Sequence, residues 1–289
     1  SSSSSGSNSG SSSASQSSSS SSSSGGSGGS GAGSGAKGIT YSPYTNSGSC
    51  KDASTIKSDI AKLKDFDLIR LYDTDCSGVE NVLAAKGSSQ KLFAGIYHIN
   101  KIQDAVDTLS SAVKNVDGGW DNIHTVSIGN ELVNSGESKP SDIKTAIDTA
   151  RSALKSAGYS GKIVSVDTLV AVQNNDELCQ YSDYIAVNSH PFWDGNVDAS
   201  GAGDFLQKQI SNIKSKCGGD KSVLITETGW PTKGDTYGSA VPSKDNQEKA
   251  LKSIIDSCGD QVVLFTTYDD LWKSPGKYNV EQYWGIFSD

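Results

Sequence analysis

From residue 37 onward, short runs rich in apolar and β-branched residues alternate with segments whose apolar residues recur three and four positions apart. The first pattern is typical of buried strands and the second of amphipathic helices. The runs predict eight strands, at Gly38–Ser42, Asp67–Tyr72, Lys91–His98, His124–Asn130, Lys162–Asp167, Asp183–Asn188, Ser222–Glu227 and Gln261–Tyr268. Helical spacing lies between them, for example at Ile102, Val106, Leu109 and Val113. The chain is therefore expected to be an α/β protein.

Eight strands that alternate with helices predict a (β/α)8 TIM barrel, whose usual length is about 250 residues. Removing the first 36 of the 289 residues leaves 253, which fits one such domain. A doubly wound open sheet is the structural alternative. It would be favoured by a glycine-rich phosphate loop after the first strand, but the sequence there reads Tyr41-Ser-Pro-Tyr44. The barrel is the better prediction.

The first 36 residues are nearly all serine and glycine. Such a segment has little apolar surface to bury, so we predict that residues 1–36 form a disordered linker and residues 37–289 the (β/α)8 barrel. No Asn-x-Ser/Thr sequon occurs, so any glycosylation is expected to be O-linked along the serine-rich segment, the alternative being an unmodified spacer. The chain has no methionine, and we expect a processed or truncated chain.

The net charge of -8 and the absence of a lysine or arginine cluster argue against a nucleic-acid or anionic-membrane partner. Five cysteines occur without a Cys-x-x-Cys pair, so no zinc site is expected. Cys50 and Cys76 follow the first two strands and could pair. Of Cys179, Cys217 and Cys258, one pair is plausible, most simply the first two. Disulfides would indicate an oxidising compartment, although five free thiols remain an alternative.

Two glutamates stand where predicted strands end. Glu131 follows the fourth strand, and Glu227 ends the apolar run that begins at Val223. A carboxylate is costly to bury unless it is paired or used, and a barrel carries its active site at the carboxyl ends of its strands. Two carboxylates flanking one bond are what glycosidic cleavage requires. We therefore expect a sugar-cleaving site, the alternative being that each glutamate forms an ion pair with a nearby lysine or arginine.

The environment of each glutamate suggests its role. Asn130 could hydrogen-bond a sugar 2-hydroxyl beside Glu131. Glu227 must stay ionised to attack, and His190 or a rim tyrosine could donate to it. The charge on Glu227 would then raise the pKa of Glu131 and keep it protonated. Pyranose rings stack on aromatic faces, so Trp230 and Tyr41 are expected to contact substrate. Further candidates are Tyr72, Tyr97, Tyr268 and Trp193, with Phe192 and Trp272 as possible packing residues.

The segments Ser127-Ile-Gly-Asn-Glu131 and Ile225-Thr-Glu-Thr-Gly-Trp-Pro231 resemble the acid/base and nucleophile motifs of glycoside hydrolase family 17. Other segments resemble the same family, namely Gly38–Tyr41, Ile69–Tyr72, Val187–Phe192, Tyr268–Lys273 and Glu281–Phe287. The resemblance implies that Glu131 is the proton donor and Glu227 the nucleophile. It also implies that Asp270, Lys273 and Glu281 are supporting polar residues near the cleft. His190 departs from the tyrosine usual in plant members.

The sequence is most similar to the fungal soluble-cell-wall-protein branch of that family. The expected protein is thus a secreted, monomeric retaining glycosidase of the cell wall that needs no metal or organic cofactor. It would act on β-1,3-glucan as an endo-1,3-β-glucosidase, a β-1,3-glucanosyltransferase, or both. Two alternatives remain open: a β-glycanase of the same barrel type with another linkage specificity, and a non-catalytic glucan-binding wall protein.

Overall fold

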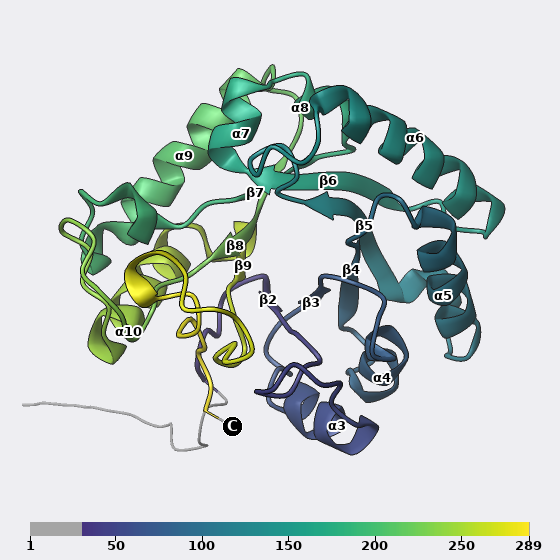
Figure 1. The fold of residues 1–289 in the computed structure, drawn as a ribbon, viewed down its shortest axis with the longest axis horizontal. Helices are drawn as coiled ribbons and strands as arrows, with labels where there is room; N and C mark the ends of the chain where they lie inside the picture. Colours follow the sequence, from purple (N-terminus) through teal and green to yellow (C-terminus); the bar gives the residue numbers. More distant parts are fainter. Residues whose placement is uncertain (1–30, 289) are drawn as a thin grey trace, which may run out of the picture.

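The computed structural model describes residues 31–288, in which eight parallel strands close into a barrel in sequence order (Figure 1). The strands are β2 (Gly38–Thr40), β3 (Leu68–Leu71), β4 (Lys91–Ile96), β5 (Ile123–Asn130), β6 (Lys162–Thr168), β7 (Ile185–Asn188), β8 (Val223–Thr228) and β9 (Val262–Leu264). Each corresponds to a predicted strand, and closure between β9 and β2 excludes the open doubly wound sheet. The predicted (β/α)8 barrel is confirmed.

Helices surround the barrel as an outer ring (Figure 1). The α-helices are α3 (Ala53–Ala61), α4 (Gly78–Ala85), α5 (Ile102–Lys114), α6 (Pro140–Ser156), α7 (Leu169–Asn174), α8 (Leu178–Tyr181), α9 (Ala202–Lys216) and α10 (Lys244–Cys258). Short 3-10 turns lie at Gly119–Asn122, Pro191–Asp194, Ala199–Gly201, Gly259–Gln261 and Lys277–Asn279. Pro140 opens α6, and the Asp142 carboxylate accepts from the N–H of Lys139 at 2.8 Å. Proline suits this position because the first helical N–H has no partner within the helix.

The last strand is shorter than predicted. The sequence pattern extends it to Tyr268, but the strand ends at Leu264. The N–H of Thr266 donates to the carbonyl of Trp284 at 3.1 Å, and the N–H of Thr267 donates to that of Thr40 at 3.1 Å. Because these groups bond to neighbouring segments at the barrel mouth, they no longer take part in regular strand pairing.

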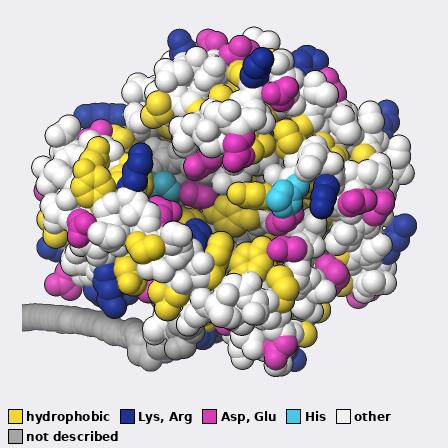
Figure 2. All heavy atoms as spheres, viewed as in Figure 1, with side chains coloured by type: hydrophobic (Ala, Val, Ile, Leu, Met, Phe, Trp, Pro, Cys, Tyr) yellow, Lys and Arg dark blue, Asp and Glu magenta, His cyan; other side chains and the backbone are white. Residues whose placement is uncertain are grey.

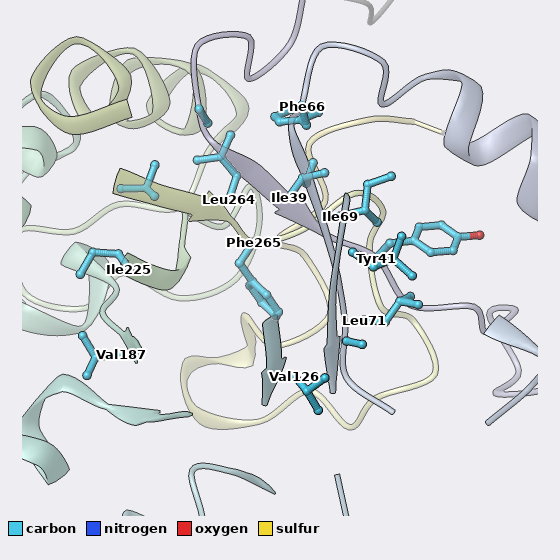
Figure 3. Close-up of a cluster of buried hydrophobic side chains, with 14 of the residues drawn as sticks. Ile39, Tyr41, Phe66, Ile69, Leu71, Val126, Val187, Ile225, Leu264 and Phe265 are labelled. Carbon is cyan, nitrogen blue, oxygen red and sulfur yellow. The ribbon is translucent and has the colours of Figure 1, made fainter. Parts of the chain in front are cut away.

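Side chains alternate between the inside of the barrel and the helix layer, as they must along a strand. The interior cluster is Leu68, Phe93, Val164, Val166, Tyr184, Ala186, Leu224 and Val263. A larger cluster lies between the strands and the helices, and Figure 3 shows part of it, including Ile39, Tyr41 and Ile69. On β3, Leu68 faces inward, so Arg70 two residues later does too. A buried arginine thus stands below the barrel mouth.

Two disulfides join segments that the sequence analysis placed near one another. Cys50 bonds to Cys76, and Cys179 bonds to Cys217. Cys258 is a buried free thiol. Both pairings are among those expected. Within residues 31–288, no helix combines the length and the apolar character needed to cross a membrane.

The predicted linker over residues 1–36 falls mostly outside the described residues and stays a prediction there. Residues 31–36 are described, and they lie against the barrel. Ala36 is buried, and the N–H of Lys37 donates to the carbonyl of Gly259 at 2.8 Å. Ala36, the last residue of the predicted linker, therefore packs with the barrel.

Candidate active site

The carboxyl ends of the strands surround a cleft of about 1530 Å³. Figure 2 shows this face hollowed near its centre, with acidic, histidine and hydrophobic side chains around the hollow. Glu131 and Glu227 both line the cleft. The two strand-end glutamates, which lie three repeats apart in the sequence, therefore share one site, as the barrel prediction required.

Glu227 lies on β8 where the pairing with both neighbouring strands shifts register. The Tyr72 hydroxyl donates a hydrogen bond to Glu227 Oε2 at 2.5 Å, and His190 Nε2 lies 3.0 Å from Oε1. Arg70 Nη1 is 3.5 Å from Oε2. Burial alone would raise the pKa of Glu227, but the His190 hydrogen bond and the Arg70 charge outweigh it and lower the pKa to about 2. Glu227 is therefore ionised at neutral pH.

Glu131 follows an irregularity at the end of β5. The pairing of β5 with β6 shifts register between Ile128 and Asn130, Gly129 has φ 74°, and Glu131 itself has φ 56°. A side-chain-bearing residue in this left-handed region costs about 1–2 kcal/mol, so the surrounding contacts must hold it there. Bulges of this kind commonly re-aim a side chain beside an active site. The result is that the Glu131 side chain reaches the cleft.

The Glu131 carboxylate has a different environment from that of Glu227. Asn188 Nδ2 donates to Oε2 at 2.8 Å. Burial raises the pKa of Glu131, and the negative charge of Glu227 raises it further, while the Asn188 hydrogen bond acts in the opposite direction. This is the direction that the sequence analysis expected. One glutamate thus favours the proton and the other does not.

Arg70 connects the two glutamates and was not among the residues proposed from the sequence. Its side chain is 1% exposed. Nη2 donates to Asn130 Oδ1 at 3.1 Å, and Nη1 donates to Asn188 Oδ1 at 3.3 Å and to the carbonyl of Thr226 at 2.8 Å. A charged residue inside the otherwise apolar strand Leu68–Leu71 was the available signal, because a buried arginine needs acceptors.

Of the ten proposed substrate-binding residues, six line the cleft: Tyr72, Tyr97, Asn130, His190, Lys273 and Glu281. Tyr41, Trp230, Tyr268 and Asp270 do not. Asp270 is 5% exposed and pairs with Lys273 at 3.1 Å, so it supports a residue that lines the cleft. Tyr268 is 7% exposed and packs in the hydrophobic core.

Tyr41 and Trp230, which were expected to contact substrate, are both fully buried and do not line the cleft. Tyr41 continues the alternation of β2 toward the helix layer, where its hydroxyl donates to Asp59 Oδ2 on α3 at 2.5 Å. Trp230 donates from Nε1 to the carbonyl of Val241 at 3.0 Å. Both are packing residues with satisfied polar groups.

Other aromatic residues line the cleft, where Tyr41 and Trp230 were expected to lie. Trp193, Tyr237 and Tyr278 line the cleft and contact one another, with ring centroids 4.7–6.1 Å apart. Tyr44 and Trp272 form a second group, with centroids 5.1 Å apart. Tyr237 lies in a loop and Tyr278 in the 3-10 turn Lys277–Asn279, so neither belongs to the strand and helix patterns from which candidates were proposed.

A parallel eight-stranded barrel with two cleft glutamates of opposed pKa shift has the architecture of a glycoside hydrolase. The chain belongs to the family described as BtgE/BtgC glycoside hydrolase domain, whose family model matches residues 38–285. This membership confirms the glycosidase class expected from the sequence.

Two yeast proteins are close relatives. The chain is 59% identical over 253 residues to "Probable family 17 glucosidase SCW10" of Saccharomyces cerevisiae, covering 88% of this chain and 65% of that protein. It is 57% identical over 254 residues to "Cell surface mannoprotein MP65" of Candida albicans, covering 88% of this chain and 67% of that one. The chain thus spans about two thirds of the length of these relatives.

A solved structure has the same fold. The β-1,3-glucanosyltransferase of glycoside hydrolase family 17 from Rhizomucor miehei superposes with a TM-score of 0.71 at 22% identity, covering 87% of this chain and 92% of that one. A plant β-glucan endohydrolase superposes with a TM-score of 0.64 at 18% identity, covering 86% and 96%. These likenesses support the barrel architecture.

Proposed function

We propose that this chain is a retaining glycosidase that cleaves β-1,3-glucan through a covalent glycosyl-enzyme. The observation that carries the proposal is the opposed shift of the two cleft glutamates. The pKa of Glu227 falls to about 2, whereas burial and the Glu227 charge raise that of Glu131. This arrangement provides an ionised carboxylate ready to attack and favours the protonated form of the carboxyl group that would donate.

In the first step, Glu131 gives its proton to the glycosidic oxygen while Glu227 attacks the anomeric carbon. The glycosidic bond breaks, the leaving sugar departs with the proton, and an ester forms between Glu227 and the remaining sugar. Esterification removes the negative charge of Glu227, which is one cause of the raised pKa of Glu131. Glu131 is then ionised and suited to act as a base.

In the second step, Glu131 takes a proton from water or from a sugar hydroxyl, and that oxygen attacks the anomeric carbon and releases Glu227. Attack by water gives hydrolysis, and attack by a sugar gives transfer. Asn130, whose Oδ1 accepts from Arg70 and Asn188, is placed to offer its amide nitrogen to the sugar 2-hydroxyl. His190 and Tyr72 would orient the Glu227 carboxylate for attack. They would hydrogen-bond to it again once the sugar has left.

An uncharged glucan suits a cleft with aromatic faces and polar groups. The β-1,3 linkage is supported by the resemblance to family 17 and by two solved neighbours, a β-1,3-glucanosyltransferase and an active-site mutant of it in complex with laminaritriose. Comparing turnover of laminarin with that of xylan, mannan and cellulose tests the linkage. Preference for one of the other polymers would favour the alternative of a different β-glycanase.

The retaining mechanism has a direct test. A 2-deoxy-2-fluoro laminaribiosyl fluoride should label the protein once, and peptide mass spectrometry should locate the sugar on Glu227. Proton NMR of early products from laminarihexaose should show the β anomer first. First appearance of the α anomer would overturn the mechanism, and absence of any turnover would favour a non-catalytic glucan-binding protein. Products longer than the hexaose would show transfer.

We also propose that the chain acts at the cell surface, remodelling wall glucan. The Candida albicans relative is named a cell surface mannoprotein, and the two disulfides suit an oxidising compartment. Immunolocalisation of the full-length protein on intact cells, before and after glucanase treatment, would test this. Signal confined to the cell interior would contradict it.

A further inference from the structure

The segment that carries Glu131 is anchored to the end of β6. The N–H of Glu131 donates to the carbonyl of Val166 at 3.0 Å. Two further hydrogen bonds tie this segment to a side chain of β6. The N–H groups of Val133 and Asn134 donate to the Asp167 carboxylate at 2.9 and 3.2 Å. Asp167 lies near the end of β6 and is 4% exposed.

Asp167 also accepts from its neighbour on the other side. Its Oδ1 receives the N–H of Thr168 at 2.8 Å, and the Thr168 hydroxyl is 3.1 Å from Asn134 Oδ1. The same hydroxyl caps α7 by accepting from the N–H of Ala171 at 3.0 Å. The turn after Glu131 is thereby fixed to the junction between β6 and α7.

This anchoring adds to the packing of Leu132 and Val133 against the hydrophobic core, and it bears directly on the conformation of Glu131. Its φ of 56° is unfavourable for a residue with a side chain. The contact described for its carboxylate is the single hydrogen bond from Asn188. Two further bonds of the turn are internal, from the N–H of Ser135 to the carbonyl of Glu131 at 3.0 Å and from that of Gly136 to Val133 at 3.1 Å. These cannot fix where the turn sits on the barrel.

We propose that Asp167 is a positioning residue for the proton donor: its carboxylate holds the turn after Glu131 so that the Glu131 carboxyl group reaches the glycosidic oxygen. The inference rests on the proposed function of Glu131 as acid/base. Asp167 does not line the cleft, so it acts through the turn rather than on the sugar. Burial raises the pKa of Asp167, and the three backbone N–H donors act in the opposite direction. The Asp167 carboxyl group offers its oxygens to all three donors, whereas an asparagine of the same size would turn its own N–H groups toward at least one of them.

The test is the dependence of Asp167→Asn on the leaving group. The value of kcat/KM reports the first irreversible step, in which a sugar leaving group needs a proton and 2,4-dinitrophenolate does not. For Asp167→Asn, we expect kcat/KM on laminarihexaose to fall about 10- to 100-fold, because small displacements of catalytic groups have effects of this size. We expect kcat/KM on 2,4-dinitrophenyl β-laminaribioside to stay within about threefold of wild type, since general acid assistance is not required there.

The ratio of the two kcat/KM values is measured on one preparation, so it does not depend on the fraction of the variant that is folded. Asp183→Asn is a matched control. Asp183 also accepts a backbone N–H, that of Ile163 at 2.7 Å, but it precedes β7 at the opposite end of the barrel. Its substitution should leave the ratio unchanged. An equal change of ratio in both variants would overturn the positioning role.

Glu131→Gln, measured beside them, separates this inference from the proposed function. A changed ratio in both Glu131→Gln and Asp167→Asn supports both. A changed ratio in Glu131→Gln alone overturns the role of Asp167 and leaves the proposed function standing. An unchanged ratio in Glu131→Gln overturns the assignment of Glu131 as the proton donor and, with it, the positioning role.

Discussion

The Tyr72 hydroxyl donates to Glu227 Oε2 at 2.5 Å, and this contact is one of those that lower the pKa of Glu227 to about 2. Replacing Tyr72 with phenylalanine removes the donor and leaves the ring. A hydrogen bond to a charged group contributes about 1.5–3 kcal/mol. At 1.36 kcal/mol for each pKa unit, its loss should raise the pKa of Glu227 by about 1–2 units.

Glu227 must be ionised to attack, so activity is lost as the pH falls through its pKa. The acid limb of kcat/KM on laminarihexaose should therefore lie near pH 2 in the wild type and about 1–2 units higher in Tyr72→Phe. Rates measured from pH 2.5 to 6, with circular dichroism at each pH to confirm folding, would show this. At pH 3 the wild type should retain most of its activity and the variant should not.

Tyr97→Phe provides the matched control. Tyr97 also lines the cleft, but its ring packs against that of His98, with centroids 5.1 Å apart. Its acid limb should coincide with that of the wild type. An acid limb that does not move in Tyr72→Phe would refute the reasoning that hydrogen bonding to Glu227 keeps this group ionised. A shift of equal size in both variants would refute the assignment to Tyr72.

Three further predictions concern other parts of the structure. Glu131→Ala should turn over 2,4-dinitrophenyl β-laminaribioside slowly, and azide should restore the rate with formation of a β-glycosyl azide, because a small anion needs no general base; an α-azide would contradict retention. Since Glu227 has a lowered pKa, its contribution to stability is present above about pH 4.5 and is lost as the pH falls toward 2. In urea titrations, the decrease in unfolding free energy on acidification should be about 3 kcal/mol smaller for Glu227→Gln than for wild type. Equal decreases in the two proteins would contradict the low pKa. Replacing both Cys179 and Cys217 with alanine opens a crosslink of 38 residues and should lower the unfolding free energy by about 4 kcal/mol in urea denaturation, whereas an unchanged midpoint would count against the crosslink.

Patterns along the chain were sufficient to predict the barrel and the location of its site. Strand and helix periodicity is local, and a parallel barrel places every strand's carboxyl end at the same mouth, so Glu131 and Glu227 could be brought together without coordinates. The same repeat order allowed the pairings of Cys50 with Cys76 and of Cys179 with Cys217, and the structure selected them from the alternatives left open.

Those patterns could not predict the direction in which individual side chains point. Tyr41 and Trp230 stand beside the right strands but are buried, because which face a residue takes depends on alternation and on register shifts that only strand pairing creates. The Arg70 side chain meets Asn188 from a position 118 residues away in the sequence, and this contact joins the surroundings of the two glutamates.

The difference between the two glutamates arises in the same way. Both are strand-end acids in the sequence, and their residue type gives them the same ordinary pKa. Glu227 is surrounded by Arg70 of β3, Tyr72 directly after β3 and His190 after β7. For Glu131, burial and a neighbouring negative charge outweigh its hydrogen bond from Asn188. Residue type and periodicity were thus enough to predict the two carboxyl groups and their approximate location in the barrel. Their charge states depend on distances between distant parts of the chain, which exist only once the barrel has closed.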